Sequence, residues 1–279
     1  MKSIAIIGKH SAIGSALIHQ LGQNNYNIKC SARRPDVDAV FLDLSRYDPN
    51  AHPFNEAPDT AFISAAMVVQ KECEERPDEA WKINVEKTIT LVEKFLSQGS
   101  HVIIPSTNLV LGSQQAFLDI NTPLAPFGVY GKTKAALETQ FKDHPKVSIV
   151  RFTKILEKDR GIIPIWKNAL KTGQPVNIVT NVNIAPISIN YAVRFLHALV
   201  DKKLAGIWHV SGKEDISYKN LFDAMQKAFT SSTKNNPDVH INYFEQEKSI
   251  LYGSLNADKS TKQIGLGYQL LDDVFIDLS

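Results

Sequence analysis

Residues 3–14 read SIAIIGKHSAIG, an apolar run followed by a turn that contains Gly8 and Gly14. The apolar run predicts a buried strand over Ser3–Ile7, and the stretch Ile13–Leu21 predicts a helix directly after the turn. A glycine at the end of a strand permits a tight turn, and the following helix N-terminus offers unpaired backbone N–H groups to a pyrophosphate. The stretch therefore indicates a dinucleotide-binding strand, turn and helix.

Outward from this stretch, short apolar runs alternate with helical stretches as far as residue 151. Runs that are apolar throughout suit strands buried on both faces, and their alternation with helices implies parallel pairing. We therefore expect an α/β fold, a Rossmann-type doubly wound parallel sheet, with residues 1–151 as the dinucleotide-binding domain. The expected strands are Asn27–Ser31, Ala39–Leu42, Ala61–Ser64, His101–Ile104 and Val147–Val150, and the expected helices are Asp78–Leu96 and Tyr130–Phe141.

In residues 152–279, helical stretches alternate with short strands. This pattern predicts mainly a smaller α/β lobe that covers the carboxyl edge of the sheet. The boundary at residue 151 is approximate, and the expectation allows the chain to cross between the two lobes. Ser231–Pro237 is the most loop-like stretch. The expected helices of this lobe are Ile165–Lys171, Ile189–Leu199 and Tyr218–Phe229, and its expected strands are Asn177–Val179, Gly206–Val210 and His240–Tyr243.

Composition excludes several classes of protein. The 279 residues carry a formal net charge of +2, which gives no case for a nucleic-acid or membrane-surface partner. Cys30 and Cys73 are too few for a disulfide framework, and no spacing of ligands supports a metal site. No run is long enough for a signal sequence or a membrane span, so we expect a cytoplasmic protein. The oligomeric state stays open, a homodimer included.

The cofactor site is predicted from the ends of the first four strands. Arg33 and Arg34 follow the second strand, where an NAD enzyme usually has an acid. Their guanidinium groups suit a 2′-phosphate, so we expect NADP(H) to be the cofactor rather than NAD(H). Ala65 and Ala66 follow the fourth strand with small side chains that let a flat ring lie close to the backbone. The glycine turn is expected to contribute Gly8, His10, Ser11, Ala12, Ile13 and Gly14.

A catalytic group is predicted at the start of the helix near residue 130. Tyr130 and Lys134 have a YxxxK spacing, which puts both on one face of a helix. A lysine ammonium stabilises a phenolate and so favours proton exchange by the tyrosine. Tyr130 and Lys134 are also expected to contribute to the cofactor site, where the lysine reaches a ribose hydroxyl. Thr107 follows the fifth strand, at the sheet edge where ligands bind, and its hydroxyl could orient the substrate oxygen that Tyr130 protonates. The plain alternative for Thr107 is a cap or turn residue.

In this order and spacing the motifs resemble the dTDP-4-dehydrorhamnose reductase family of extended short-chain dehydrogenases. The glycine turn resembles the GxxGxxG fingerprint, with Ser11 in place of the middle glycine. The resemblance implies that Asp43 and Leu44 lie against the adenine. Further stretches that resemble the family are Ser64-Ala65-Ala66, Glu74-Glu75-Arg76-Pro77, Ile83-Asn84-Val85, Ser106–Gly112, Ala185-Pro186-Ile187-Ser188, Gly206-Ile207-Trp208-His209 and Ser254-Leu255-Asn256.

The departures from the family concentrate where the substrate would lie. Asn108 and Leu109 replace an Asp and a Tyr, and Lys154 replaces a Trp that the family places against substrate and nicotinamide. We assign Met67, Asn108 and Lys154 to the substrate. The pattern puts the family's particular sugar in doubt more than its type of reaction.

Three functions remain open on the sequence. The first is NADPH-dependent reduction of a keto group on a nucleotide-linked sugar, with Tyr130 as proton donor. The second is an NAD-dependent sugar-nucleotide epimerase; a dehydratase is disfavoured because Asn108 and Leu109 stand where it needs an Asp-Glu pair. The third is a non-catalytic NADP-binding subunit, since the resembled family includes a regulatory partner of methionine adenosyltransferase.

Overall fold

The structure is a computed structural model that describes residues 1–112, 115–230, 237–247 and 251–279. Most of the predicted loop Ser231–Pro237 therefore lies outside the described residues.

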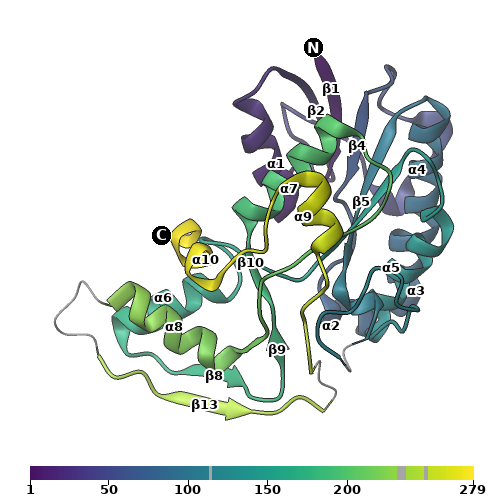
Figure 1. Ribbon diagram of the computed structural model, residues 1–279. Coiled ribbons are helices and arrows are strands. Elements are labelled where there is room, and N and C mark those ends of the chain that lie inside the picture. Colours follow the sequence, from purple (N-terminus) through teal and green to yellow (C-terminus); the bar gives the residue numbers. More distant parts are fainter. Residues whose placement is uncertain (113–114, 231–236, 248–250) are drawn as a thin grey trace.

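A seven-stranded parallel sheet forms the larger part of the molecule (Figure 1). Its strand order is β11-β6-β5-β4-β1-β2-β3, so the chain starts in the interior of the sheet and winds outward in both directions from β1. This is the doubly wound α/β fold that the sequence predicts, which is thereby confirmed. The strands are β1 (Lys2–Ile7), β2 (Tyr26–Ala32), β3 (Val40–Phe41), β4 (Thr60–Ile63), β5 (His101–Thr107), β6 (Val147–Phe152) and β11 (Gly206–Val210).

Helices cover both faces of this sheet. The alternation along β1 shows why both faces need cover: Ile4 and Ile6 join one core cluster, whereas Ala5 and Ile7 join the other, and all four are buried. Figure 1 shows α1, α7 and α9 over the first face and α3, α4 and α5 over the second. The helices are α1 (Ala12–Gly22), α2 (Gln70–Glu75), α3 (Pro77–Trp81), α4 (Thr88–Ser97), α5 (Gly128–Phe141), α7 (Ile189–Lys202) and α9 (Asp258–Ile264). Short helical turns are η1 (Leu44–Arg46), η2 (Pro49–Ala51) and η4 (Asn108–Val110).

A smaller lobe has its own apolar core, which includes Trp166, Phe222 and Phe275. In Figure 1 it lies below the large sheet, with the strand pair β8–β13 at its outer side. Its elements are β7 (Lys154–Leu156), α6 (Ile162–Thr172), β8 (Val176–Val179), β9 (Asn183–Ile184), β10 (Pro186–Ser188), β12 (Ile216–Ser217), α8 (Tyr218–Thr230), β13 (Ile241–Phe244) and α10 (Leu271–Leu278).

The placement of Gly206–Val210 and Ile189–Leu199 in the smaller lobe is wrong. Strand β11 pairs with β6 and forms the edge of the large sheet, and α7 packs beside α1 over the same sheet. The chain therefore leaves the large lobe after β6, returns for α7 and β11, leaves again for β12, α8 and β13, and returns once more for α9, which packs on β11. Local periodicity gives a strand and a helix correctly here, but it does not say which sheet they join.

Two further elements differ from the prediction for identifiable reasons. Strand β5 continues past Ile104 to Thr107 despite Pro105. Pairing with β4 ends at Ile103, whereas pairing with β6 continues to Thr107, so the missing N–H of the proline is tolerated on the β4 side. The predicted helix Asp78–Leu96 is α3, a π-helical stretch η3 (Lys82–Lys87) and α4 in succession.

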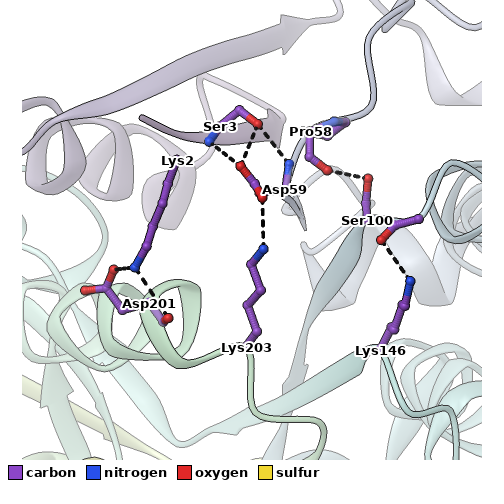
Figure 2. A network of polar contacts seen from close by, with 9 residues as sticks. Lys2, Ser3, Pro58, Asp59, Ser100, Lys146, Asp201 and Lys203 are labelled. Carbon is purple, nitrogen blue, oxygen red and sulfur yellow. Dashed lines mark hydrogen bonds and ion pairs between the residues drawn. The ribbon is translucent and has the colours of Figure 1, made fainter.

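The amino-terminal edge of the large sheet is held by paired polar groups (Figure 2). The Asp59 carboxylate accepts from the backbone N–H and the hydroxyl of Ser3 and from the Lys203 ammonium, 3.0 Å away. Lys2 pairs with Asp201 at the end of α7. These contacts join the starts of β1 and β4 to the segment between α7 and β11.

No helix among the described residues is both long enough and apolar enough to cross a membrane.

Candidate active site

A cavity of about 630 Å³ lies at the carboxyl edge of the large sheet, between it and the smaller lobe. This volume is within the range of small-molecule sites. The large lobe contributes the ends of β4, β5 and β6 and the starts of α1 and α5. Of the predicted site residues, the cavity is lined by Ser11, Ala12, Ile13, Ala66, Thr107, Asn108, Tyr130, Lys134 and Lys154.

Ser11 caps helix α1 at the cavity. Its hydroxyl accepts from the backbone N–H of Gly14 at 3.0 Å and makes a short contact with the Ser64 hydroxyl at the end of β4. Its φ of −67° is ordinary for any residue, so serine in place of the family's middle glycine costs no backbone strain. The cap satisfies one orphan N–H of the helix and leaves others toward the cavity.

Gly8 and Gly14 are required by close packing in the same turn. Gly8 has φ +99°, and a Cβ there would lie 3.1 Å from the backbone nitrogen of Ala65. A Cβ on Gly14 would lie 2.4 Å from the carbonyl oxygen of Gly8, closer than real contacts allow. These two glycines therefore bring β1, α1 and the end of β4 together, although neither they nor Ala65 line the cavity itself.

His10 does not line the cavity and is held by an acid that the sequence analysis did not single out. Asp36 lies 2.7 Å from the Lys9 ammonium and 3.0 Å from Nε2 of His10. The hydrogen bond to Lys9 is the largest of the effects that lower the pKa of Asp36. On the other side, Arg160 from the smaller lobe donates to the carbonyl oxygen of His10 at 3.3 Å. The cofactor turn is thus contacted from both lobes.

The predicted adenosine-binding residues are distributed unevenly. Arg33 and Arg34 are exposed and make no hydrogen bond or ion pair with any residue that the structure describes. Asp43 accepts from the backbone and hydroxyl of Ser45, capping η1. Leu44 is buried in the core of the large lobe, so its side chain supports the site from inside.

The backbone after β4 is fixed by Asn84. Its side chain accepts from the N–H of Met67 at 2.8 Å and donates to the carbonyl of Met67 at 2.9 Å. Asn84 lies in η3, and π-helical stretches often occur at functional sites. Met67 itself packs partly buried against the core and is not among the cavity residues, whereas its neighbours Ala66 and Val68 are.

Thr107 combines both interpretations made from the sequence. It is the last residue of β5, and its hydroxyl caps η4 by accepting from the backbone N–H of Leu109 at 3.3 Å. The same residue lines the cavity beside Tyr130 and Lys134. The Thr107 hydroxyl also donates to Oδ1 of Asn108 at 3.3 Å, so it would turn its proton from Asn108 to a ligand oxygen when a ligand binds.

Tyr130 and Lys134 share one face of α5. The Lys134 ammonium lies 5.8 Å from the centre of the Tyr130 ring and donates to the carbonyl oxygen of Pro105 at 2.9 Å. Burial lowers the pKa of Lys134 to about 8, although the nearby Glu138 carboxylate acts in the opposite direction. Burial raises the pKa of Tyr130 above its usual range. This is opposite to the lowering expected from an adjacent ammonium, because burial outweighs it and the ammonium is bonded to Pro105.

A buried ion pair lies beneath this face. The guanidinium of Arg151 makes three bonds of 2.6–3.1 Å to the Glu138 carboxylate, and both side chains are at most 2% exposed. Glu138 also accepts from the hydroxyl of Ser106, next to Thr107. Arg151 continues to Nε2 of His209, whose Nδ1 donates to the carbonyl of Asn256. Burial, with Arg151 nearby, lowers the pKa of His209 to about 3, so this imidazole is neutral.

The remaining substrate-facing predictions lie where the lobes meet. Asn108 donates to the carbonyl of Gly253 at 3.1 Å and so ties η4 to a segment that closes the cavity. Asp215 holds the same segment by accepting from the backbone N–H of Gly253 and of Ser254. Lys154 begins β7 and lines the cavity with Glu157.

Sequence reasoning missed most of the wall that the smaller lobe provides. These residues come from short strands and helices that carry no motif, so no local signal would have identified them. Three missed residues belong instead to the large lobe: Ser106 directly precedes Thr107, and Val68 and Gln70 follow Ala66 at the end of β4. The missed cavity residues include Val68, Gln70, Ser106, Glu157, Trp166, Asn177, Tyr218 and Gln246. Within the described parts of the chain, no group of three or more His, Cys, Asp or Glu side chains could hold a metal ion.

Two curated proteins are similar to the chain. Methionine adenosyltransferase 2 subunit beta of Danio rerio is 26% identical over 273 residues, covering 86% of this chain and 76% of that protein. An uncharacterised membrane protein of Methanocaldococcus jannaschii is 30% identical over 152 residues. That match covers 50% of this chain, and the chain spans only 41% of that relative's length.

Solved structures match over nearly the whole chain. A dTDP-4-dehydrorhamnose reductase of Bacillus anthracis in complex with NADP has a TM-score of 0.85 at 19% identity, covering 99% of this chain and 100% of that one. A dTDP-4-dehydrorhamnose reductase of Clostridium acetobutylicum has a TM-score of 0.84 at 23% identity, covering 99% of both. A UDP-glucose 4-epimerase of Thermotoga maritima with UDP-glucose has a TM-score of 0.83 at 16% identity, covering 99% of this chain and 96% of that one. These likenesses show a shared fold.

The family model described as the RmlD substrate binding domain matches residues 1–263, nearly all of the sequence. The resemblance drawn from the sequence motifs is thereby confirmed. The chain belongs to the RmlD substrate binding domain family.

Proposed function

We propose that the protein reduces a keto group on a nucleotide-linked sugar with NADPH as hydride donor. The observation that carries this proposal is the meeting of Thr107, Tyr130 and Lys134 with the start of α1 around one cavity. The helix N-terminus suits a pyrophosphate, and the three side chains suit a carbonyl that gains a hydride and a proton. When bound, the cofactor would supply the hydride.

The protonation states favour the reductive direction. A raised pKa keeps the hydroxyl of Tyr130 protonated at neutral pH, so it can donate its proton to the carbonyl oxygen. Thr107 would donate a hydrogen bond to the same oxygen. Lys134 would hold positive charge beside the phenolate left on Tyr130, which its pKa of about 8 allows at pH 7.

The cofactor assignment rests on Arg33 and Arg34. Both are exposed and unpaired among the described residues, directly after β2. A guanidinium can bind a 2′-phosphate with two charge-assisted hydrogen bonds. The structural likeness to a reductase in complex with NADP supports the same choice.

The test is NADPH oxidation, followed by absorbance, with a panel of nucleotide-linked 4-keto sugars. We expect turnover in the parent and a loss of about 10²-fold or more in Tyr130→Phe, which removes the proton donor and keeps the ring. NADPH affinity should be nearly the same in both proteins. Turnover by Tyr130→Phe at the parent rate would contradict the role of this residue.

A sugar-nucleotide epimerase is the second candidate, favoured by the fold shared with the Thermotoga maritima enzyme. An epimerase returns the hydride to the same substrate, so it would interconvert two sugars without net oxidation of NADPH. Product analysis by NMR in the presence of catalytic NAD separates the two reactions.

A non-catalytic subunit is the third candidate, favoured by the similarity to a methionine adenosyltransferase subunit over 86% of the chain. It predicts tight NADPH binding with no turnover of any keto sugar. The reductase proposal would then fail, while cofactor binding would stand.

A further inference from the structure

Two adjacent side chains on the cavity wall lack partners. The hydroxyl of Thr153 is buried and has no hydrogen-bond partner among the described residues. The ammonium of Lys154 likewise forms no hydrogen bond and no ion pair with any described residue. Both residues line the cavity. Buried polar groups are nearly always satisfied, so the hydroxyl of Thr153 without a partner indicates that an acceptor belongs beside it. Lys154 is exposed and lines the same cavity, so a ligand bound there can reach its ammonium.

The other cations of this region contrast with Lys154. Lys134 donates to the carbonyl of Pro105, and Arg151 is neutralised by Glu138. Burial lowers the pKa of Lys154, and Glu157 raises it by less. Glu157 makes no ion pair with it, and burial raises the pKa of that carboxyl. The positive charge of Lys154 is therefore only partly compensated within the protein.

The strand register places this pair close to the reacting carbonyl. Phe152 is the partner of Thr107 across β5 and β6, and Lys154 follows two residues later. Two residues span at most about 7 Å and paired strands lie about 4.8 Å apart, so the Cα atoms of Lys154 and Thr107 lie within about 12 Å of each other. With a long lysine side chain, this separation suits two groups on one sugar ring.

We propose that Thr153 and Lys154 bind an anionic group on the sugar itself, so that the substrate is a nucleotide sugar carrying a carboxylate. The inference rests on the proposed function. A carboxylate accepts from both an ammonium and a hydroxyl, and it leaves the carbonyl free for Thr107 and Tyr130. The same chemistry could come from the pyrophosphate of the nucleotide, and the experiment distinguishes the two sources.

The experiment is titration calorimetry on the full chain saturated with NADP⁺. The ligands are UDP-glucose, UDP-glucuronic acid and UDP, together with the thymidine forms of the neutral sugar and the free nucleotide. UDP-glucuronic acid differs from UDP-glucose only by a carboxylate in place of a hydroxymethyl group. The variants are Lys154→Met, Lys154→Arg and Thr153→Val, with Lys171→Met on the exposed side of α6 as the matched control.

We expect the affinity of the parent for UDP-glucuronic acid to be at least about tenfold higher than its affinity for UDP-glucose. One charge-assisted hydrogen bond accounts for a difference of this size. Lys154→Met should abolish that preference and leave UDP affinity unchanged. Lys154→Arg should keep most of it, Thr153→Val should lose part of it, and Lys171→Met should match the parent.

Equal affinity of the parent for the two sugars would overturn this inference and leave the proposed function intact. Equal weakening of UDP, UDP-glucose and UDP-glucuronic acid by Lys154→Met would assign Lys154 to the pyrophosphate and also overturn it. Failure of the parent to bind any uridine or thymidine nucleotide would overturn the proposed function, and the inference with it.

Discussion

The two edges of the large sheet differ in whether their charged side chains are paired. At the amino edge, Lys2 pairs with Asp201, and Asp59 is bonded to Ser3 and Lys203 (Figure 2). At the carboxyl edge, Arg33, Arg34, Lys154 and Glu157 make no ion pair with the described residues. The same strands run from one edge to the other, so the strand backbone does not account for the difference.

The comparison indicates what each edge contributes. Paired charges at the amino edge join the ends of elements and are complete without a ligand. The unpaired charges at the carboxyl edge lie where open α/β sheets bind their ligands, and we propose that they bind cofactor and substrate. Some charges at this edge are also paired: Asp36 pairs with Lys9 and His10 in the turn after β1. Glu138 pairs with Arg151 and bonds Ser106, which lines the cavity.

The largest effect is expected where a charge at the carboxyl edge is buried. Glu138→Gln would leave the guanidinium of Arg151 buried without a counter-charge, which typically costs about 3–5 kcal/mol of folding stability. Urea unfolding followed by circular dichroism measures this cost. Glu93→Gln, on the exposed side of α4, is the control and should change the stability by less than about 0.5 kcal/mol. A similar small effect for both variants would show that the ion pair does not stabilise the fold.

The next effect concerns Lys134 and the pH dependence of reduction. Since the ammonium form is the one required, the rate should fall as pH rises above about 8, where Lys134 loses its proton. Lys134→Met should lower the rate by about 10²-fold and remove this limb of the profile. It should also weaken NADPH binding, because the lysine would also reach the ribose. A pH–rate profile that is unchanged in shape would argue against the assignment.

A smaller effect is expected at the unpaired arginines. Arg33→Ala combined with Arg34→Ala should weaken NADPH binding about tenfold or more and leave NADH binding almost unchanged, because only NADPH has a 2′-phosphate. Fluorescence titrations with each cofactor, on parent and variant, measure this. Raising the salt concentration should erode the parent's preference, since both side chains are exposed. Equal affinity of the parent for both cofactors would remove the basis for assigning NADP.

The smallest effect is expected at the amino edge. The backbone N–H of Ser3, followed by Lys203, lowers the pKa of Asp59 to about 2. A lowered pKa stabilises the fold above the unfolded value near 4, and this contribution is lost as pH falls toward 2. Asp59→Asn should therefore destabilise by less than about 1 kcal/mol at pH 7, since the pair is exposed to solvent. The difference should vanish below about pH 2; a constant difference across pH would exclude an ionic origin.

The local elements of the large lobe could be predicted because burial on both faces leaves a strong apolar pattern. The extension of β5 to Thr107 could not be predicted. A proline such as Pro105 is evidence against a strand unless the pairing on each side of the strand is known. The placement of β11 was beyond local reasoning for the same reason: pairing partners are set by tertiary structure.

The residues of the site likewise fall into those that the sequence could predict and those that it could not. Thr107, Tyr130 and Lys134 could be predicted to lie together because they follow from strand ends and helix spacing. Their roles in the reaction stay predictions. Asp36, which holds Lys9 and His10, and Thr153, whose hydroxyl lacks a partner, could not be identified, because their contacts depend on segments that fold back from elsewhere.

The late return of the chain to β6 has a consequence during synthesis. Strand β6 ends at Phe152, but its partner β11 ends only at Val210. At about 5–20 residues per second, the outer edge of β6 stays uncovered for roughly 3–12 s after it is made. An apolar strand with unpaired backbone groups can pair with other chains. We therefore expect nascent chains that end before Gly206 to aggregate, and chains that extend past Val210 to lose this exposed edge.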